Sequence, residues 1–381
     1  MKTRYNGIAI AMVCLIPLIL FYQNCSGGFK VINGVQLGQD SSSSGTTPTA
    51  TPAAPGSAKK VDMVLVWGSS DTVTMSCDGG ESWTYHGFDP AHLNDGDGPY
   101  SATSIHYQDG LMYRSRGWGG AQPTIEKSVD GMKWEIVYQF PINYFLSGFA
   151  INGKDFVYAD GDAFMHSADA GVNWSQVTVP DGTRHLRALS YDYAGKKRML
   201  FYGEGNAIVM SPDNGLTWSR TYSQGQGESA CAAVVISGGA EALIGIGHEG
   251  QVCRSTDGGV TWKYTAMIPG YYDSGKVIWT GKEYIAYPSN QDIIFRSRDG
   301  VTWTSQKGGF FALNQSQIFR NSNTGKYYAY AYANTFVQSA DGITWTKIET
   351  SKQPPTTGGD EYLSNVAQGM MTINPGHPCY K

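Results

Sequence analysis

Charge is sparse in this sequence, and neither sign predominates strongly. Charged residues make up 16% of the 381 positions, and the formal net charge is −4. A chain without a surplus of Lys and Arg lacks the attraction to phosphate backbones on which nucleic-acid binding depends, so we expect no nucleic-acid partner. Long helical patterns are absent too, because no long segment repeats its apolar residues every 3.6 positions. The composition is that of a soluble, β-rich protein.

The apolar run near the N-terminus is short for a membrane-spanning helix. It extends from Gly7 to Tyr22, behind the basic residues Lys2 and Arg4. A basic start followed by a short apolar run is typical of an export signal, so residues 1–24 are predicted to be a signal peptide. The mature protein is therefore expected outside the cytoplasm.

A cysteine, Cys25, directly follows the predicted signal peptide. This arrangement resembles the processing site of bacterial lipoproteins, in which the cysteine is acylated and becomes the mature N-terminus. The usual motif has Leu three positions before the cysteine and Gly or Ala one before it, whereas this chain has Tyr22 and Asn24. The resemblance implies a lipid anchor in the bacterial cell envelope, at the outer membrane or cell surface. The alternative is a cleaved secretory peptide with an incidental cysteine, which implies a periplasmic or secreted protein.

Residues 25–60 contain this cysteine and a segment rich in Ser, Thr, Pro, Ala and Gly. Such a composition cannot bury a core, so we predict a disordered linker there. A flexible tether of this length has a reach of about 30 to 35 Å. The folded domain is predicted over residues 61–381.

Within the predicted domain, one pattern is repeated seven times. Each copy has a Ser two positions before an Asp, and a Gly three positions before a Trp. The Asp-to-Trp spacing is five in four copies and four in the other three, whereas the Gly-to-Trp spacing is constant. The aspartates are Asp78, Asp130, Asp169, Asp213, Asp257, Asp299 and Asp341.

Each residue type in the pattern suits a tight turn. Asp can accept hydrogen bonds from the backbone N–H groups that follow it, and Gly supplies the positive φ that tight turns often need. The Ser hydroxyl can bond a further backbone group, and the Trp buries a large ring beside the turn. None of these roles needs a substrate, so we interpret the pattern as structural.

The repeated pattern resembles the Asp-box, or bacterial neuraminidase repeat, over about residues 61 to 375. The resemblance implies an all-β, seven-bladed β-propeller in which each box joins the third and fourth strands of a blade. The boxes would lie at the periphery, away from the central mouth. Members of this family include sialidases, xyloglucan hydrolases, sortilin-type receptors and a photosystem II assembly factor, so the fold alone does not determine function.

The spacing of the boxes fits four-stranded blades. Successive box aspartates are 52, 39, 44, 44, 42 and 42 residues apart, enough for one blade each. In blade three we expect strands at 145–152, 155–158, 163–167 and 174–179. Blade one lacks an N-terminal first strand, and residues 361–369 are similar to the first strand of blade three. We therefore expect the C-terminus to complete blade one and close the ring, which protects strand edges.

Four cysteines follow the signal region, and the topology suggests one pair. Cys231 and Cys253 are expected in the first and third strands of one blade, about 10 Å apart and too far for a bridge. Cys77 lies in the first box, and Cys379 follows the closing strand. We predict a disulfide between Cys77 and Cys379, worth about 5 kcal/mol in the chain-entropy model; the alternative is two free thiols.

Acidic loop residues are weak candidates for catalysis at the mouth. In sialidases an arginine ahead of the first box helps to bind the substrate carboxylate, but this chain has no arginine between Tyr5 and Tyr113. Two carboxylates at a suitable separation could still make a glycoside hydrolase. The same short acidic sequences are also typical of tight turns. The candidates, in loops between second and third strands, are Asp160, Asp162, Glu204, Glu249 and Asp292.

Aromatic residues gather at the expected starts of the innermost strands. They could form a platform for a sugar ring or a peptide at the mouth, and the alternative is core packing between blades. The predicted ligand-binding residues are Trp118, Tyr144, Arg187, Tyr271, Tyr272, Phe310 and Tyr362.

We therefore expect a monomeric, non-catalytic module that binds a glycan or protein ligand at its mouth, without a cofactor or metal. The box face would lie toward the membrane and the mouth away from it. The alternatives are a glycoside hydrolase and a scaffold factor for a membrane protein.

Overall fold

The computed structural model describes most of the expected domain and a short segment before it. Every described residue lies in a strand, a turn or an irregular connection, and none of these residues forms a helix that could cross a membrane. The described residues are 30–32, 58–68, 73–87, 104–116, 123–140, 148–160, 163–180, 186–203, 208–221, 223–224, 235–239, 241–247, 249–271, 275–288, 291–308, 318–321, 323–331, 335–348 and 363–380.

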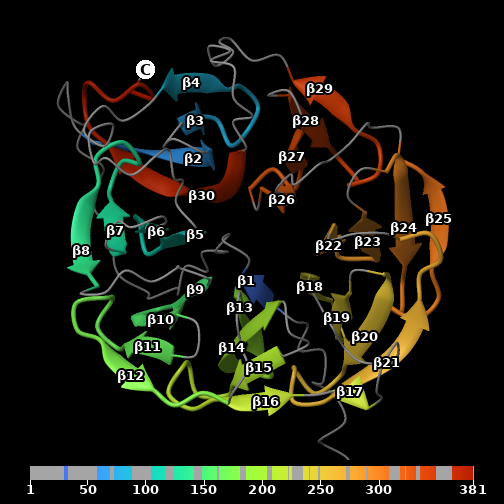
Figure 1. The fold of residues 1–381 in the computed structure, drawn as a ribbon. Coiled ribbons are helices and arrows are strands. Elements are labelled where there is room, and N and C mark those ends of the chain that lie inside the picture. Colours follow the sequence, from blue (N-terminus) through green and yellow to red (C-terminus); the bar gives the residue numbers. More distant parts are fainter. Residues whose placement is uncertain are drawn as a thin grey trace, which may run out of the picture.

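Seven sheets, each built on four antiparallel strands, stand around a central axis, which confirms the expected all-β, seven-bladed propeller (Figure 1). From the centre outward, blade one is β30 (Leu363–Ile373), β2 (Lys59–Gly68), β3 (Val73–Ser76) and β4 (Thr84–Gly87). Blade two is β5 (Ser104–Gln108), β6 (Leu111–Arg116), β7 (Thr124–Ser128) and β8 (Glu135–Gln139). Blade three is β9 (Gly148–Asn152), β10 (Asp155–Asp160), β11 (Ala163–Ser167) and β12 (Ser175–Val177).

The remaining blades follow in chain order. Blade four is β13 (Leu186–Tyr193), β14 (Lys196–Gly203), β15 (Ile208–Ser211) and β16 (Ser219–Thr221). Blade five is β18 (Val235–Gly238), β19 (Leu243–Ile246), β20 (Gln251–Ser255) and β21 (Trp262–Met267), with β17 (Ser223–Gln224) on its outer edge. Blade six is β22 (Lys276–Trp279), β23 (Tyr284–Tyr287), β24 (Ile293–Ser297) and β25 (Thr304–Lys307). Blade seven is β26 (Ile318–Arg320), β27 (Tyr327–Ala331), β28 (Thr335–Ser339) and β29 (Thr346–Ile348).

The hydrophobic core lies between the blades. The described residues form seven buried clusters, one at each interface between neighbouring blades. Successive side chains of a strand point to opposite faces, so Met63 and Leu65 pack toward blade two while Val64 and Val66 pack toward blade seven. A strand buried on both faces needs a continuous apolar run, which explains the sequence of β2.

The C-terminal strand completes blade one, as expected from the sequence. β30 pairs antiparallel with β2 from Lys59↔Ile373 to Trp67↔Asn365. The carboxylate of Asp62 accepts hydrogen bonds from Gln368 (3.0 Å), Asn321 (3.1 Å) and Asn323 (2.8 Å). Gln368 belongs to β30 and the two asparagines belong to blade seven, so one carboxylate joins the two ends of the ring.

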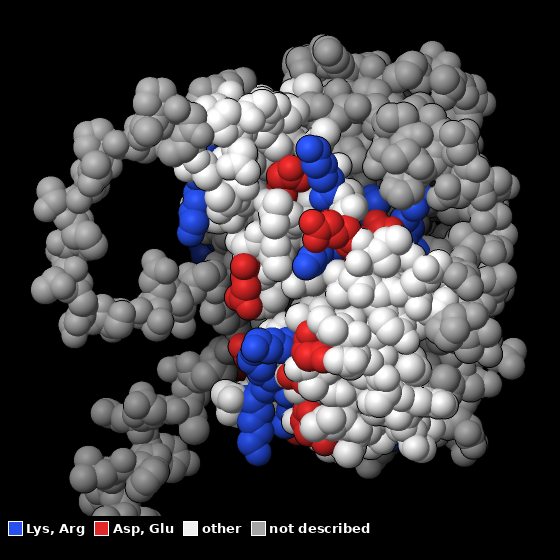
Figure 2. All heavy atoms as spheres, turned by 90° about the vertical axis from the view of Figure 1, so that its left-hand side faces the viewer, with Lys and Arg blue, Asp and Glu red and all other residues white. Residues whose placement is uncertain are grey.

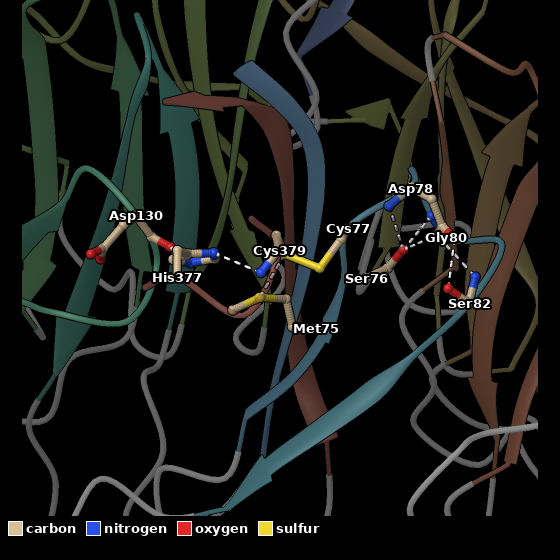
Figure 3. Close-up of a disulfide and its surroundings, with 9 residues drawn as sticks. All are labelled: Met75, Ser76, Cys77, Asp78, Gly80, Ser82, Asp130, His377 and Cys379. Atoms are coloured by element: carbon tan, nitrogen blue, oxygen red, sulfur yellow. Dashed lines mark hydrogen bonds between the residues drawn. A yellow bond between two sulfur atoms is a disulfide. The ribbon is translucent and has the colours of Figure 1, made fainter. Parts of the chain in front are cut away.

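A disulfide between Cys77 and Cys379 links the first box to the turn after β30 (Figure 3). In the same turn, the Cys379 N–H donates to Nδ1 of His377, and His377 Nε2 lies 3.0 Å from the Asp130 carbonyl oxygen. The C-terminal turn is therefore fixed to the boxes of both blade one and blade two.

Cys253 is also disulfide-bonded. Cys231 lies outside the described residues, and β18 is described only from Val235 onward. The expectation that Cys231 and Cys253 are too far apart to bridge therefore stays a prediction.

Two hydrogen bonds of the box serine recur in all seven copies. In each box, the Ser hydroxyl donates to the Asp carboxylate and accepts a hydrogen bond from the N–H of the box glycine. Hydrogen bonds from the backbone and the side-chain amide of Asn173 lower the pKa of Asp169 to about 2. These carboxylates are engaged in turns and are poorly suited to act as general acids.

The box glycine also packs against the neighbouring blade. Gly131 has a φ of 75°, and a methyl group on it would lie 2.3 Å from Leu65 of blade one. Gly300, with a φ of 73°, would meet Ile244 of blade five at 2.2 Å. Glycine is therefore required both for the turn and for the close contact between blades.

Part of the predicted linker forms a strand, and this corrects the linker prediction for that part. β1 (Lys30–Ile32) pairs antiparallel with β13, the innermost strand of blade four. In Figure 1, β1 lies at the centre of the ring beside β13. The β-prone residues Val31 and Ile32 lie in a segment that has no core of its own. The segment gains backbone partners at a strand edge that no other described strand covers.

Candidate ligand-binding site at the central channel

Arg114, on β6, forms a buried ion pair. Its Nε donates a hydrogen bond to Glu126 on the adjacent strand (2.7 Å), and Nη2 lies 2.6 Å from the same carboxylate; the two side chains are 1% and 3% exposed. The guanidinium also lies 4.3 Å from the ring centre of Trp134. This arginine stabilises blade two and is not exposed to a ligand.

Two basic residues stand at the starts of inner strands, on the face opposite the boxes. Arg187 is the second residue of β13 and is exposed, and Lys276 is the first residue of β22. Burial, and to a smaller extent the charge of Arg187, lower the pKa of Lys276 to about 8. The two cations are therefore within electrostatic range of each other near the channel. Sequence reasoning missed Lys276 because it examined these positions for arginine and aromatic residues only.

Two of the acidic candidates in the described residues, Glu249 and Asp292, interact with side chains of their own blade. Glu249 accepts a hydrogen bond from Nε2 of Gln251 (3.2 Å), next to Gly250 with a φ of 82°. Asp292 lies 3.8 Å from Nζ of Lys307, a side chain that is 83% exposed. Asp160 ends β10, and Asp162 and Glu204 lie outside the described residues. Their role as an acid–base pair stays a prediction.

Tyr271 corrects one member of the predicted aromatic platform. Its side chain is 1% exposed and packs in the cluster between blades five and six, near Phe295. Its hydroxyl accepts a hydrogen bond from the N–H of Gly275 (3.2 Å). The core-packing alternative therefore holds for this ring. Trp118, Tyr144, Tyr272, Phe310 and Tyr362 lie outside the described residues, as does the lipidation candidate Cys25.

No group of three or more His, Cys, Asp or Glu side chains suited to a metal occurs among the described residues. Charges of both signs are interspersed on the side of the ring seen in Figure 2, which is not covered by a broad field of one sign. In the described part of the channel, the features that could bind a ligand are the basic residues Arg187 and Lys276 and the strand edge that holds β1.

Comparison with known proteins supports the fold. No family model matches the chain, and no curated protein matches it. A catalytically inactive virginiamycin B lyase from Staphylococcus aureus with quinupristin is 14% identical, with 73% of this chain and 93% of that chain covered and a TM-score of 0.54. A functionally unknown protein from Desulfotomaculum acetoxidans is 7% identical over 82% and 99% of the two chains, with a TM-score of 0.54. A structure of YCF48 bound to D1 peptide is 14% identical over 64% and 80%, with a TM-score of 0.47. At these identities the likenesses concern the propeller fold alone.

Proposed function

We propose that this chain is an exported, lipid-anchored β-propeller that binds a glycan or protein ligand at its central channel without catalysis. The observation that carries the proposal is the inner edge of β13, where the chain already adds a strand beside the exposed Arg187. Free backbone groups can bind an extended ligand, and a guanidinium can bind a carboxylate through two parallel hydrogen bonds. A protein ligand with an extended, acidic segment suits this combination best.

The test uses the full chain on a glycan array and on immobilised envelope proteins, scoring both retention and loss of terminal sugars. Retention that weakens in Arg187→Ala, with no sugar loss, supports the proposal. Lys282→Ala is the matched control, because it removes an exposed cation from a turn on the box side of blade six. Sugar loss that disappears in Glu249→Gln would replace the proposal with the glycoside hydrolase alternative.

The position of β1 bears on the proposed anchor. Lys30 pairs with Asp192 near the end of β13, and the neighbouring Tyr193 donates a hydrogen bond to the Thr256 carbonyl beside the blade-five box. This end of the channel therefore lies on the box face. Cys25 precedes Lys30 by five residues, which span at most about 17 Å when extended. An acylated Cys25 would hold the box face toward the membrane more closely than a free linker of 36 residues (25–60) could.

Apolar residues on the box face are consistent with this orientation. In four consecutive blades the residue after the box glycine is an exposed aliphatic side chain, between 41% and 59% exposed. They are Val172, Leu216, Val260 and Val301. Labelling of cells with a fatty-acid analogue tests the anchor: incorporation should disappear in Cys25→Ser. No incorporation in the parent chain would leave the secreted alternative, and equal incorporation in the variant would show that Cys25 is not the acylated residue.

A further inference from the structure

The inner edge of β13 is a long strand edge facing the channel. Among the described residues, β13 has 8 residues, and the other inner strands formed in sequence order, β5, β9, β18, β22 and β26, have 3 to 5; only β30, the closing strand of blade one, is longer, with 11. An unpaired strand edge presents a row of backbone N–H and C=O groups that another extended segment can bind. The edge of β13 therefore offers the most backbone partners among the inner strands formed in sequence order.

The chain fills part of this edge with its own residues. β1 pairs with β13 from Lys30↔Asp192 through Val31↔Tyr191 to Ile32↔Ser190, in the antiparallel direction. The described strand thus covers the half of β13 nearest the box face. Ser190, opposite Ile32, is 5% exposed, and its hydroxyl has no hydrogen-bond partner among the described residues.

The other half of the edge leads to the cationic end of the channel. Residues 186–189 of β13 have no described strand on their channel side, and Arg187 lies within this half. An extended peptide longer than β1 could pair along the whole of β13 and reach Arg187. Such a peptide would use the positions at which Lys30–Ile32 is bound.

We propose that the channel edge of β13 is a strand-addition site for an extended peptide, and that Lys30–Ile32 is its internal competitor. The part of this inference that concerns an external peptide rests on the proposed function. Strand addition obtains affinity from backbone hydrogen bonds, so the internal and external segments need not share a sequence. A tethered competitor acts at an effective concentration of about millimolar, so it excludes weak ligands and yields to strong ones.

The test compares the full-length parent with a full-length Val31→Pro/Ile32→Pro variant. Successive N–H groups of a strand point to opposite sides, so two adjacent prolines remove the donor that faces β13 whichever residue carries it. The probe is a fluorescent synthetic peptide of residues 28–36, followed by fluorescence anisotropy. A second peptide carries the same two prolines. The matched protein control is Gln36→Pro/Leu37→Pro, which places the same change outside β1.

The expected result is that the Val31→Pro/Ile32→Pro variant binds the probe at least about tenfold more tightly than the parent and the control do, because the tethered competitor is gone. The proline-containing peptide should bind none of the three proteins. Equal binding by parent and variant would overturn the proposal. So would absence of binding to a variant whose thermal unfolding matches that of the parent.

Hydrogen exchange of the parent keeps the proposal testable if the variant does not fold. Amides of residues 30–32 should exchange at least about tenfold more slowly than those of a free peptide, because they are hydrogen-bonded in a sheet. Exchange at the free-peptide rate would overturn the proposal. A ligand from the array that binds parent and variant equally would contradict the competitor while leaving the proposed function intact. Binding of the probe to the variant, with no ligand found on the array, would support the internal competitor and contradict the proposed function.

Discussion

Blades one and six share a four-stranded plan but are assembled differently. Blade six consists of four consecutive strands, β22 to β25, joined by short connections. Blade one joins β30 from the C-terminus to β2, β3 and β4 from the start of the domain. No turn links its first two strands. Instead, Asp62 of β2 accepts a hydrogen bond from Gln368 of β30, a disulfide joins the first box to the C-terminal turn, and His377 of that turn contacts the box of blade two. The difference shows that a ring closed by distant segments uses specific long-range bonds where a sequential blade uses chain continuity.

The strongest test of this difference is Cys379→Ser. Losing a bridge that closes a loop of 302 residues should lower the free energy of unfolding by about 5 kcal/mol, since the unfolded chain regains its freedom. Urea unfolding measures the loss. Cys77→Ser should cost the same, and the double variant should cost no more than either. Additive losses, or a loss below about 1 kcal/mol, would show that the bridge does not maintain the closure.

Asp62→Ala should produce the next largest effect. The buried side chains of Asn321 and Gln368 would lose their shared acceptor, at a cost of about 3 kcal/mol. Asp292→Ala in blade six is the control, because its ion-pair partner Lys307 is exposed and the pair is worth less than about 0.5 kcal/mol. Thermal unfolding of both variants gives the comparison. Equal losses would mean that blade one does not depend on this carboxylate.

The interface between blades two and three, which follow each other in the chain, should instead weaken in acid. Burial lowers the pKa of His106 to about 4, against 6.5 for the free side chain, although Nε2 donates to the Phe149 carbonyl oxygen of blade three. The unfolded chain binds a proton as the pH falls through 6.5, whereas the folded chain does not until about pH 4. The contribution of His106 to the free energy of unfolding is therefore fully present above pH 6.5. It decreases as the pH falls below 6.5, by about 2 kcal/mol at about pH 4.5.

Urea unfolding at several pH values measures this loss, and His106→Gln is the reference variant. Its stability should depend less on pH over this interval than that of the parent. The same dependence in both proteins would assign the acid sensitivity to other groups.

The smallest effect distinguishes long from short boxes. In the four boxes with five-residue Asp-to-Trp spacing, the Trp indole N–H donates to the box glycine carbonyl, at 2.7 to 3.1 Å. In the short boxes of blades six and seven, the indole nitrogens of Trp303 and Trp345 are buried and have no hydrogen-bond partner among the described residues. Trp262→Phe should therefore cost about 1 kcal/mol more than Trp303→Phe in urea unfolding. An equal cost would mean that these tryptophans stabilise the protein through the packing of their rings alone.

The repeated turns made the fold predictable because their chemistry is local. Ser, Asp, Gly and Trp at fixed spacing satisfy one another within one box, so the seven blades and the closing role of the C-terminus followed from the sequence. The candidate site was less predictable, because it depends on which distant side chains and edges meet. Tyr271 occupies a strand-start position like the other aromatic candidates, yet the packing of blade six against blade five buries it.

The sequence by itself determined the number of blades, the position of each box and the innermost place of the C-terminal strand. These features depend on turn hydrogen bonds and on the alternation of apolar residues, both of which are encoded within a few positions. Only the tertiary structure decided that Arg114 pairs with Glu126, that Lys276 stands near Arg187, and that Lys30–Ile32 adds to β13. Each of these contacts joins surfaces that become neighbours only when the ring is formed, and a short segment has no periodicity from which its partner could be inferred.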